Sequence, residues 1–196
     1  MKATAFPAVT HILSRRTRGL AACLLSALLG MAAAHAQHPA SYTGQEQRSI
    51  KALSDEEAKQ YLSGAGMGFA KAGELNHYPG PMHVLELADK LELTSGQRAQ
   101  TVQLMDAHKA QARELGRKVV AAERELDELF RAGRANEADL AAKVRAAAAA
   151  QGEFRLSHLE THRRMRGLLS AEQVSRYDAL RGYTAGAVQH THGGKH

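Results

Sequence analysis

Between residues 105 and 129, apolar or near-apolar side chains recur at steps that alternate between three and four residues. Such steps return to the same face of an α-helix, so the alternation predicts a long helix with a heptad seam. Nothing in this stretch interrupts the alternation. The seam positions are Met105, His108, Ala112, Leu115, Val119, Ala122, Leu126 and Leu129.

A second strip with the same alternation follows after a short break. The break reads RAGRAN, in which Gly133 ends the first helix and Asn136 can cap the next one. Two long helices joined by a short turn fold into an antiparallel hairpin, with arms of about 35 residues and roughly 50 Å. The second strip consists of Leu140, Val144, Ala147, Gln151, Phe154, His158, Thr161, Met165 and Leu168.

The remaining sequence predicts short helices rather than strands. Aromatic residues make up only 5% of the chain, there is no Trp, and two-residue alternation of β-branched side chains is missing. Ser54 and Glu57 form a capping box for one short helix, and Pro81 suits the first position of an amphipathic helix over residues 82–93. We therefore expect an all-α fold, a long antiparallel helical hairpin with short flanking helices, and a dimer. A hairpin alone buries too little surface, so its other faces need the short helices or a second subunit.

The first 36 residues have the features of an export signal. Residues 1–18 carry four basic side chains and no acidic one, an apolar stretch follows, and Ala34–Ala36 has the small-x-small form of a cleavage site. Cleavage before Gln37 would release the protein into the periplasm. Two alternatives are an uncleaved anchor helix, although the apolar stretch is short for a span, and lipidation at Cys23, although that residue lacks a preceding apolar region.

Cysteine usage and charge exclude several kinds of site. The only cysteine lies in the signal, so the mature chain has neither an intramolecular disulfide nor a thiolate metal site. Cleavage lowers the number of Lys and Arg residues from 26 to 22, against 20 acidic residues, a formal charge of +2. This near balance argues against nucleic acid as a partner. The glycines between residues 64 and 68 do not form a phosphate loop, and nothing indicates an organic cofactor.

The mature chain divides into three parts. Residues 37–52 are polar and are expected to be a flexible N-terminal segment, residues 53–185 form the helical domain, and residues 186–196 form a disordered tail. The tail carries His190, His192 and His196, which either capture divalent metal loosely or have no role.

Two related motifs bracket the hairpin. Leu93-Thr94-Ser95-Gly96-Gln97 and Leu169-Ser170-Ala171-Glu172-Gln173 lie 76 residues apart, and each has the pattern of an apolar residue, a hydroxyl cap, two residues and Gln. The pair resembles the LTxxQ signature of the Spy/CpxP family of periplasmic proteins. The resemblance covers roughly residues 50–185, and Ser170 departs from the family's Thr in a conservative way.

This resemblance implies an all-α homodimer without enzymatic activity. Some family members are chaperones whose concave surface contacts unfolded clients. Others, the ZraP-like and CnrX-like branch, bind a transition metal through His, Glu and Met side chains from several helices. The segments YPGPMHVLELADKLELT and LLSAEQVSRYDALRGY resemble the heavy-metal-sensor branch. In agreement with a non-enzyme, the sequence shows no nucleophile–base pair and no pair of acid–base carboxylates.

The hairpin geometry suggests where a metal would bind. If the turn centres near residue 134, His158 lies opposite about residue 110, and His162 lies opposite about residue 106. These positions are close to His108 and Met105, and Met165 occupies the same seam as His158. Imidazole suits zinc, nickel, cobalt and copper, and thioether favours Cu(I).

Two further candidates and a simpler explanation stand beside this site. His83 and Glu86, at i and i+3 of a short helix, can pack across the hairpin and add ligands. Alternatively, a seam histidine is a core residue with one hydrogen bond, and a methionine at helical spacing is a packing residue.

Three functional hypotheses remain open at the level of sequence. The first is a transition-metal-binding stress protein that senses or buffers metal and signals to an inner-membrane sensor or anti-sigma partner. The second is a metal-independent chaperone of the Spy type that binds unfolded proteins. The third is a structural adaptor that only restrains a sensor kinase.

Overall fold

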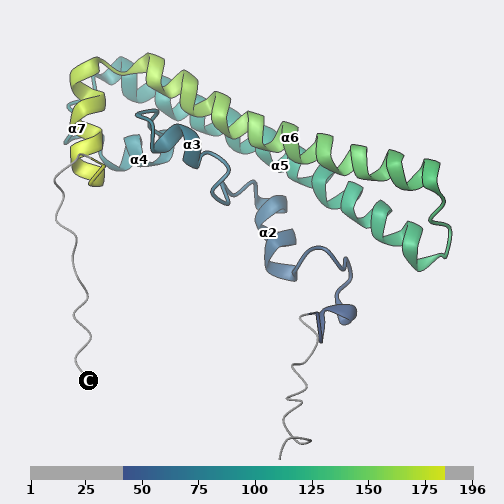
Figure 1. The fold of residues 1–196 in the computed structure, drawn as a ribbon. Helices are drawn as coiled ribbons and strands as arrows, with labels where there is room; N and C mark the ends of the chain where they lie inside the picture. Colours follow the sequence, from purple (N-terminus) through teal and green to yellow (C-terminus); the bar gives the residue numbers. More distant parts are fainter. Residues whose placement is uncertain (1–41, 184–196) are drawn as a thin grey trace, which may run out of the picture. The chain divides into compact units, whose positions relative to one another are not determined.

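The computed structural model describes residues 42–183, and all the regular structure within them is helical apart from an isolated bridge between Ile50 and Leu53. The all-α prediction is confirmed. Figure 1 shows the order of the elements along the chain. They are η1 (Gln45–Gln47), α2 (Asp55–Ser63), α3 (Lys71–Glu74), α4 (Pro81–Glu86), α5 (Ser95–Arg131), α6 (Glu137–Leu168) and α7 (Ala171–Arg181).

The two long helices α5 and α6 lie side by side as the predicted hairpin (Figure 1). Helix α5 ends at Arg131, and Gly133 adopts the left-handed φ of 65° that the turn requires. Asn136 caps α6 by accepting a hydrogen bond from the backbone N–H of Asp139 at 3.0 Å. Both residues of the predicted break therefore act as expected.

Burial along the hairpin follows the predicted seam in part. Ala112 and Val119 are fully buried, but Val144 is 47% exposed. Leu104 and Val120, which lie beside the seam on α5, are buried as well. The buried face of α5 is broader than a coiled-coil seam because α2 and α4 pack on it in addition to α6.

Helix α2 crosses α5 at a glycine. Ser54 and Glu57 form the predicted capping box, and Tyr61 buries its ring against Phe154 at a centroid distance of 5.1 Å. Gly116 on α5 is buried directly beneath the Tyr61 backbone. The absence of a side chain at Gly116 lets the two helix backbones approach closely.

The helix that starts at Pro81 is shorter than predicted. Pro81 occupies the first helical position, but α4 ends at Glu86, and residues 87–92 form turns in place of the expected helix through residue 93. Glu92 has a φ of 51°, and the N–H of Leu93 returns to the carbonyl of Ala88 at 3.0 Å. The turns bring Leu91, which has 0% exposure, into the core. Burial of this leucine therefore overrides helix propensity here.

The folded unit begins earlier than the sequence predicts. One compact unit starts at Gly44, whereas residues up to 52 were expected to be flexible. Ile50 is 2% exposed and packs with Leu53 in the same apolar cluster as Tyr61 and Phe154. The backbone N–H of Lys51 donates to the carboxylate of Asp127 at 3.2 Å. Burial of Ile50 and hydrogen bonds to α5 thus hold a segment whose composition is otherwise polar.

Candidate functional site

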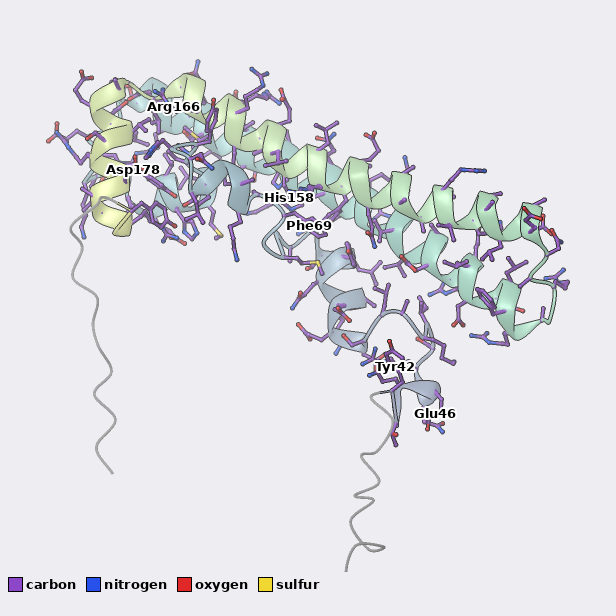
Figure 2. All side chains as sticks on the ribbon, in the orientation of Figure 1. Tyr42, Glu46, Phe69, His158, Arg166 and Asp178 are labelled. Carbon is purple, nitrogen blue, oxygen red and sulfur yellow. The ribbon has the colours of Figure 1, made fainter. Side chains whose placement is uncertain are left out.

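A cavity of about 280 Å³ lies where α5 and α6 meet the loop after α2 and the start of α4. We refer to it as the histidine cavity because three histidines from the two long helices line it. Figure 2 labels His158 and Phe69, whose rings both contact Phe154 at centroid distances of 4.6 Å and 5.5 Å. The cavity is lined by Ser63, Gly64, Ala65, Gly66, Pro81, Met82, Met105, His108, Lys109, Arg113, His158, Thr161 and His162.

The imidazoles of His108 and His158 contact each other across the hairpin. Their ring centroids are 4.5 Å apart and the rings are nearly perpendicular, at 86°. His158 is 4% exposed, and His108 is half-buried. The structure thus brings together the two histidines that antiparallel pairing around residue 134 predicts to be neighbours.

The hydrogen bonds of these histidines fix which ring nitrogen carries the proton. His158 Nδ1 lies 2.9 Å from the carbonyl oxygen of Phe154, so Nδ1 must donate. Thr161 donates its single hydroxyl hydrogen to the carbonyl of Ser157 at 2.8 Å. Its oxygen therefore accepts the N–H of His108 Nδ1 at 3.0 Å.

His162 follows the same rule. Its Nδ1 lies 2.8 Å from the carbonyl oxygen of Tyr78 and must donate to it. An imidazole that donates from Nδ1 and carries one proton has its lone pair on Nε2, the atom with which histidine commonly ligates metal. Nε2 of His158 is buried and has no hydrogen-bond partner within the described part of the chain. A buried nitrogen lone pair without a partner is unfavourable unless something binds it.

The two central histidines are held in their neutral form. Burial, with the nearby charges of His158 and His162 as further causes, lowers the pKa of His108 from 6.5 to about 4. Burial also lowers the pKa of His158, although the backbone groups of Phe154, Gly64 and Ala65 act in the opposite direction. Both imidazoles are therefore neutral at pH 7, the state that coordinates metal.

Stability is expected to decrease as the pH falls from 6.5 towards 4. In this window the unfolded chain protonates His108 while the folded chain does not, so protons favour unfolding. The slope should stay below about 1.4 kcal/mol per pH unit, because partial exposure of His108 screens the effect. Urea unfolding of wild type and His108→Gln at several pH values measures this change of the unfolding free energy with pH. The variant should show the smaller slope, and equal slopes would contradict the lowered pKa.

The other predicted ligands lie in different places. Met105 lines the histidine cavity, one turn before His108. Met165 is fully buried in the apolar cluster around Val84, Leu91 and Tyr177, away from the cavity lining. His83 donates from Nδ1 to the carboxylate of Glu86 on the same helix at 2.8 Å, and neither residue lines the histidine cavity.

Of the predicted ligands, the structure brings only His108 and His158 into ring-to-ring contact. Within residues 42–183, no three His, Cys, Asp or Glu side chains are grouped closely enough to hold one metal ion. The Nε2 edge of the His162 ring lies against Gly80, where a Cβ atom would be 2.9 Å from Nε2. His162 therefore lines the cavity, but Gly80 occupies the space next to its lone pair.

Sequence reasoning missed two side chains near this site. Met82, beside the candidate His83, lines the histidine cavity and is 48% exposed. Glu74 places its Oε2 atom 3.5 Å from Nδ1 of His162 and accepts the N–H of Gly80 at 3.1 Å. The sequence carries no signal for Glu74. Whether Met82 or His83 lines the cavity depends on how the six-residue helix α4 is rotated about its axis.

Glu74 also connects the histidine cavity to the last helix. Its Oε1 atom accepts the hydroxyl of Tyr177 on α7 at 2.5 Å and that of Tyr183 at 3.2 Å. Burial and the Glu74 carboxylate raise the pKa of Tyr177, which therefore remains a hydrogen-bond donor at neutral pH. The same carboxylate thus contacts His162 from α6 and two tyrosines at the C-terminal end of the described chain.

The two repeated motifs meet at the open end of the hairpin. Each is the predicted capping box: the hydroxyls of Thr94 and Ser170 accept the N–H of Gln97 and Gln173, respectively, at 3.1 Å. Each glutamine returns its Oε1 atom to the N–H of its own cap residue. Leu93 and Leu169 both pack in the apolar cluster that contains Met165.

The glutamines also pair with each other, which the sequence did not predict. Gln97 Nε2 donates to Gln173 Oε1 at 2.8 Å, and Gln173 Nε2 donates to Gln97 Oε1 at 3.0 Å. The second hydrogen of each amide reaches a backbone carbonyl, that of Leu168 for Gln97 and that of Leu91 for Gln173. Each amide therefore uses both donors and two acceptor positions.

Of the comparisons with known proteins, the one with family profiles gives a match, and it covers both motifs. Neither the curated proteins nor the solved structures give a match to the chain. Within residues 42–183, no helix is both long enough and apolar enough to cross a bilayer. The sequence profile described as "LTXXQ motif family protein" matches residues 81–181, just over half of the 196-residue chain, and spans both motifs. The chain therefore belongs to the LTXXQ motif family, the Spy/CpxP-like proteins.

Proposed function

We propose that this protein is a periplasmic, non-enzymatic stress protein that binds a transition metal in the histidine cavity. One observation carries the proposal: His108 and His158 contact each other with Nδ1 engaged and the lone pair on Nε2. In metal sites, a ligating histidine usually donates its other ring N–H to a protein oxygen or water, which orients the ring. The export signal predicted for residues 1–36, which lie outside the described residues, supports the periplasm.

The residues present fit an imidazole-ligated metal. His108 and His158 would supply the first two nitrogens, and Met105, which also lines the cavity, would be a further donor; Nε2 of His162 faces Gly80 instead. Zinc, nickel, cobalt and copper all accept such donors. His83, Glu86 and Met165 do not line the cavity and have no part in this proposal.

Signalling would follow from linkage between metal and helix packing. A metal held by His108 of α5 and His158 of α6 would join the two arms of the hairpin at one level. The metal would then favour whichever arrangement of the hairpin or of a homodimer brings these imidazoles together. An inner-membrane sensor or anti-sigma partner would respond to that difference, and buffering would require only the binding step.

Stoichiometric metal binding that depends on His158 is the expected result of isothermal titration. The protein would start at Gln37 and carry alanine at His190, His192 and His196, so that the tail cannot capture metal. Zinc, nickel, cobalt and Cu(I) would be titrated separately. His158→Ala and His108→Ala should each weaken binding by at least about tenfold, because each removes a ligand.

His77→Ala is the matched control for these variants. His77 is 65% exposed, contacts Asp178 and does not line the histidine cavity, so its removal should leave the affinity unchanged. Circular dichroism of each variant checks that it folds. If no metal binds more tightly than about 0.1 mM, a weak affinity, or if His77→Ala weakens binding as much as His158→Ala, the proposal is wrong.

A second candidate function is a metal-independent chaperone. It is favoured by large apolar side chains that are exposed on the hairpin, including Phe130 at 58% and Leu156 at 55%. Exposed apolar side chains can contact the apolar segments of unfolded clients. Suppression of client aggregation by metal-free protein, unchanged in His158→Ala, would place this function first.

A further inference from the structure

We infer that the metal of the histidine cavity is a soft monovalent ion, Cu(I) or Ag(I), bound by the thioethers of Met82 and Met105 together with the imidazoles of His108 and His158. This inference rests on the proposed function and specifies the ion and two further ligands. A cavity with these ligands should prefer Cu(I) or Ag(I) to zinc, nickel or cobalt.

The first argument is the chemistry of the donors. Met82 comes from α4 and Met105 from α5, and both line the cavity that His108 and His158 line. Thioether sulfur is a soft, uncharged donor that selects Cu(I) among the biological first-row ions, whereas Zn²⁺ takes thiolate, imidazole or carboxylate. Two sulfurs and two imidazole nitrogens from three helices therefore form a neutral, partly soft donor set.

The second argument is charge. Among the described residues that line the histidine cavity, none is Asp or Glu, while Lys109 and Arg113 both contribute to the lining. The Coulomb energy between these cations and a bound ion is proportional to the charge of the ion. Repulsion is therefore about twice as large for a divalent ion as for a monovalent one. Because neutral donors cannot offset this difference, the electrostatics favour a monovalent ion.

The carboxylate of Glu74, which approaches His162, does not change this balance. Glu74 approaches His162 at Nδ1, the nitrogen that already donates to Tyr78, and not at Nε2. Its oxygens accept hydrogen bonds from Tyr177, Tyr183 and the N–H of Gly80. Glu74 is thus engaged in joining α3 to α7, and using it as a ligand would require these bonds to break.

The protein also contains an internal control for methionine packing. Met165 is fully buried among Val84, Leu91 and Tyr177 and does not line the cavity. A leucine at Met82, Met105 or Met165 retains most of the apolar volume and removes the sulfur. Comparison of these positions therefore separates loss of a donor from a disturbance of packing.

The experiment is a titration of the mature protein, with the tail histidines replaced by alanine, using Ag(I) as a redox-inert probe and Cu(I) under a reductant. Zn(II), Ni(II) and Co(II) are titrated in parallel. Wild type should bind Ag(I) and Cu(I) at least about a hundredfold more tightly than the divalent ions. Met82→Leu with Met105→Leu should weaken Ag(I) binding at least about tenfold, and Met165→Leu should leave it unchanged. X-ray absorption of the Cu(I) protein should show both nitrogen and sulfur neighbours.

The possible outcomes separate this inference from the proposed function. If a divalent ion binds as tightly as Ag(I), and the double leucine variant binds normally, the inference is overturned while metal binding at the histidines stands. A copper spectrum without sulfur neighbours overturns it in the same way. If no ion binds, both the inference and the proposed function fail.

Discussion

Replacing Gly116 with alanine is expected to destabilise the fold by about 3 kcal/mol or more, the upper end of the range for overpacking. A Cβ atom at this position would lie 1.8 Å from the carbonyl oxygen of Tyr61 and 2.6 Å from its carbonyl carbon. Both are backbone atoms and cannot rotate away. Helix α2 would therefore have to leave the surface of α5, and the cluster of Ile50, Tyr61 and Phe154 would open.

Urea unfolding measures this loss, and limited proteolysis locates it. Cleavage in α2 should become faster in Gly116→Ala, because a detached helix exposes its backbone to the protease. At about 2–4 °C per kcal/mol for a chain of this size, the midpoint of thermal unfolding should fall by roughly 6–12 °C.

Gly152→Ala is the matched control on the other arm of the hairpin. Gly152 is exposed within α6, and a Cβ atom there would have no neighbour within 4 Å. Alanine should therefore stabilise this helix by about 0.5–1 kcal/mol through its higher helix propensity. The same substitution is thus expected to have opposite signs at two helical glycines. A loss of stability at both positions, or at neither, would contradict the close approach of α2 to Gly116.

The hairpin could be predicted because the information for it is local. The alternation of steps of three and four, the break at Gly133 and the cap at Asn136 each act over a few residues. The contact between His108 and His158 followed from these features, since antiparallel pairing fixes which residues face each other once the turn is located. The contact between these two histidines could therefore be predicted from the sequence.

The short elements could not be placed in the same way. Helix α4 has six residues, and its rotation about its own axis is set by the burial of Pro81 and Val84. That rotation puts Met82 into the cavity lining and leaves His83 outside it. The polar segment before α2 is likewise held by few contacts, the burial of Ile50 and the hydrogen bond from Lys51 to Asp127. Periodicity carries little information over so few residues.

The methionines illustrate the same limit within a long helix. Met105 and Met165 both occupy seam positions, yet Met105 lines the cavity and Met165 is surrounded by the apolar cluster near α7. A seam position predicts that a side chain is buried, but not what it is buried against. The residues that a seam side chain contacts depend on which short helix covers that level of the hairpin.

Replacing Gln97 with alanine is expected to cost about 2–4 kcal/mol, more than the loss of a helix cap alone. The variant loses the bond from Gln97 to the N–H of Thr94, and it leaves the carbonyl of Leu168 and the amide of Gln173 without their partners. Glu57→Ala is the matched control, because Glu57 closes a capping box at Ser54 without reaching another helix. It should cost only about 1 kcal/mol. Urea unfolding measures both variants.

A double-mutant cycle tests whether the two motifs act as one unit. If the amides of Gln97 and Gln173 hold the open end of the hairpin together, the double alanine variant should cost less than the sum of the single variants, by about 1–3 kcal/mol. Strict additivity, or a cost for Gln97→Ala no larger than that for Glu57→Ala, would mean that each motif is only a helix cap. A measured coupling would explain why the signature ends in glutamine: an amide donates and accepts at once, so two copies can bind each other, whereas two glutamates in the same positions would repel.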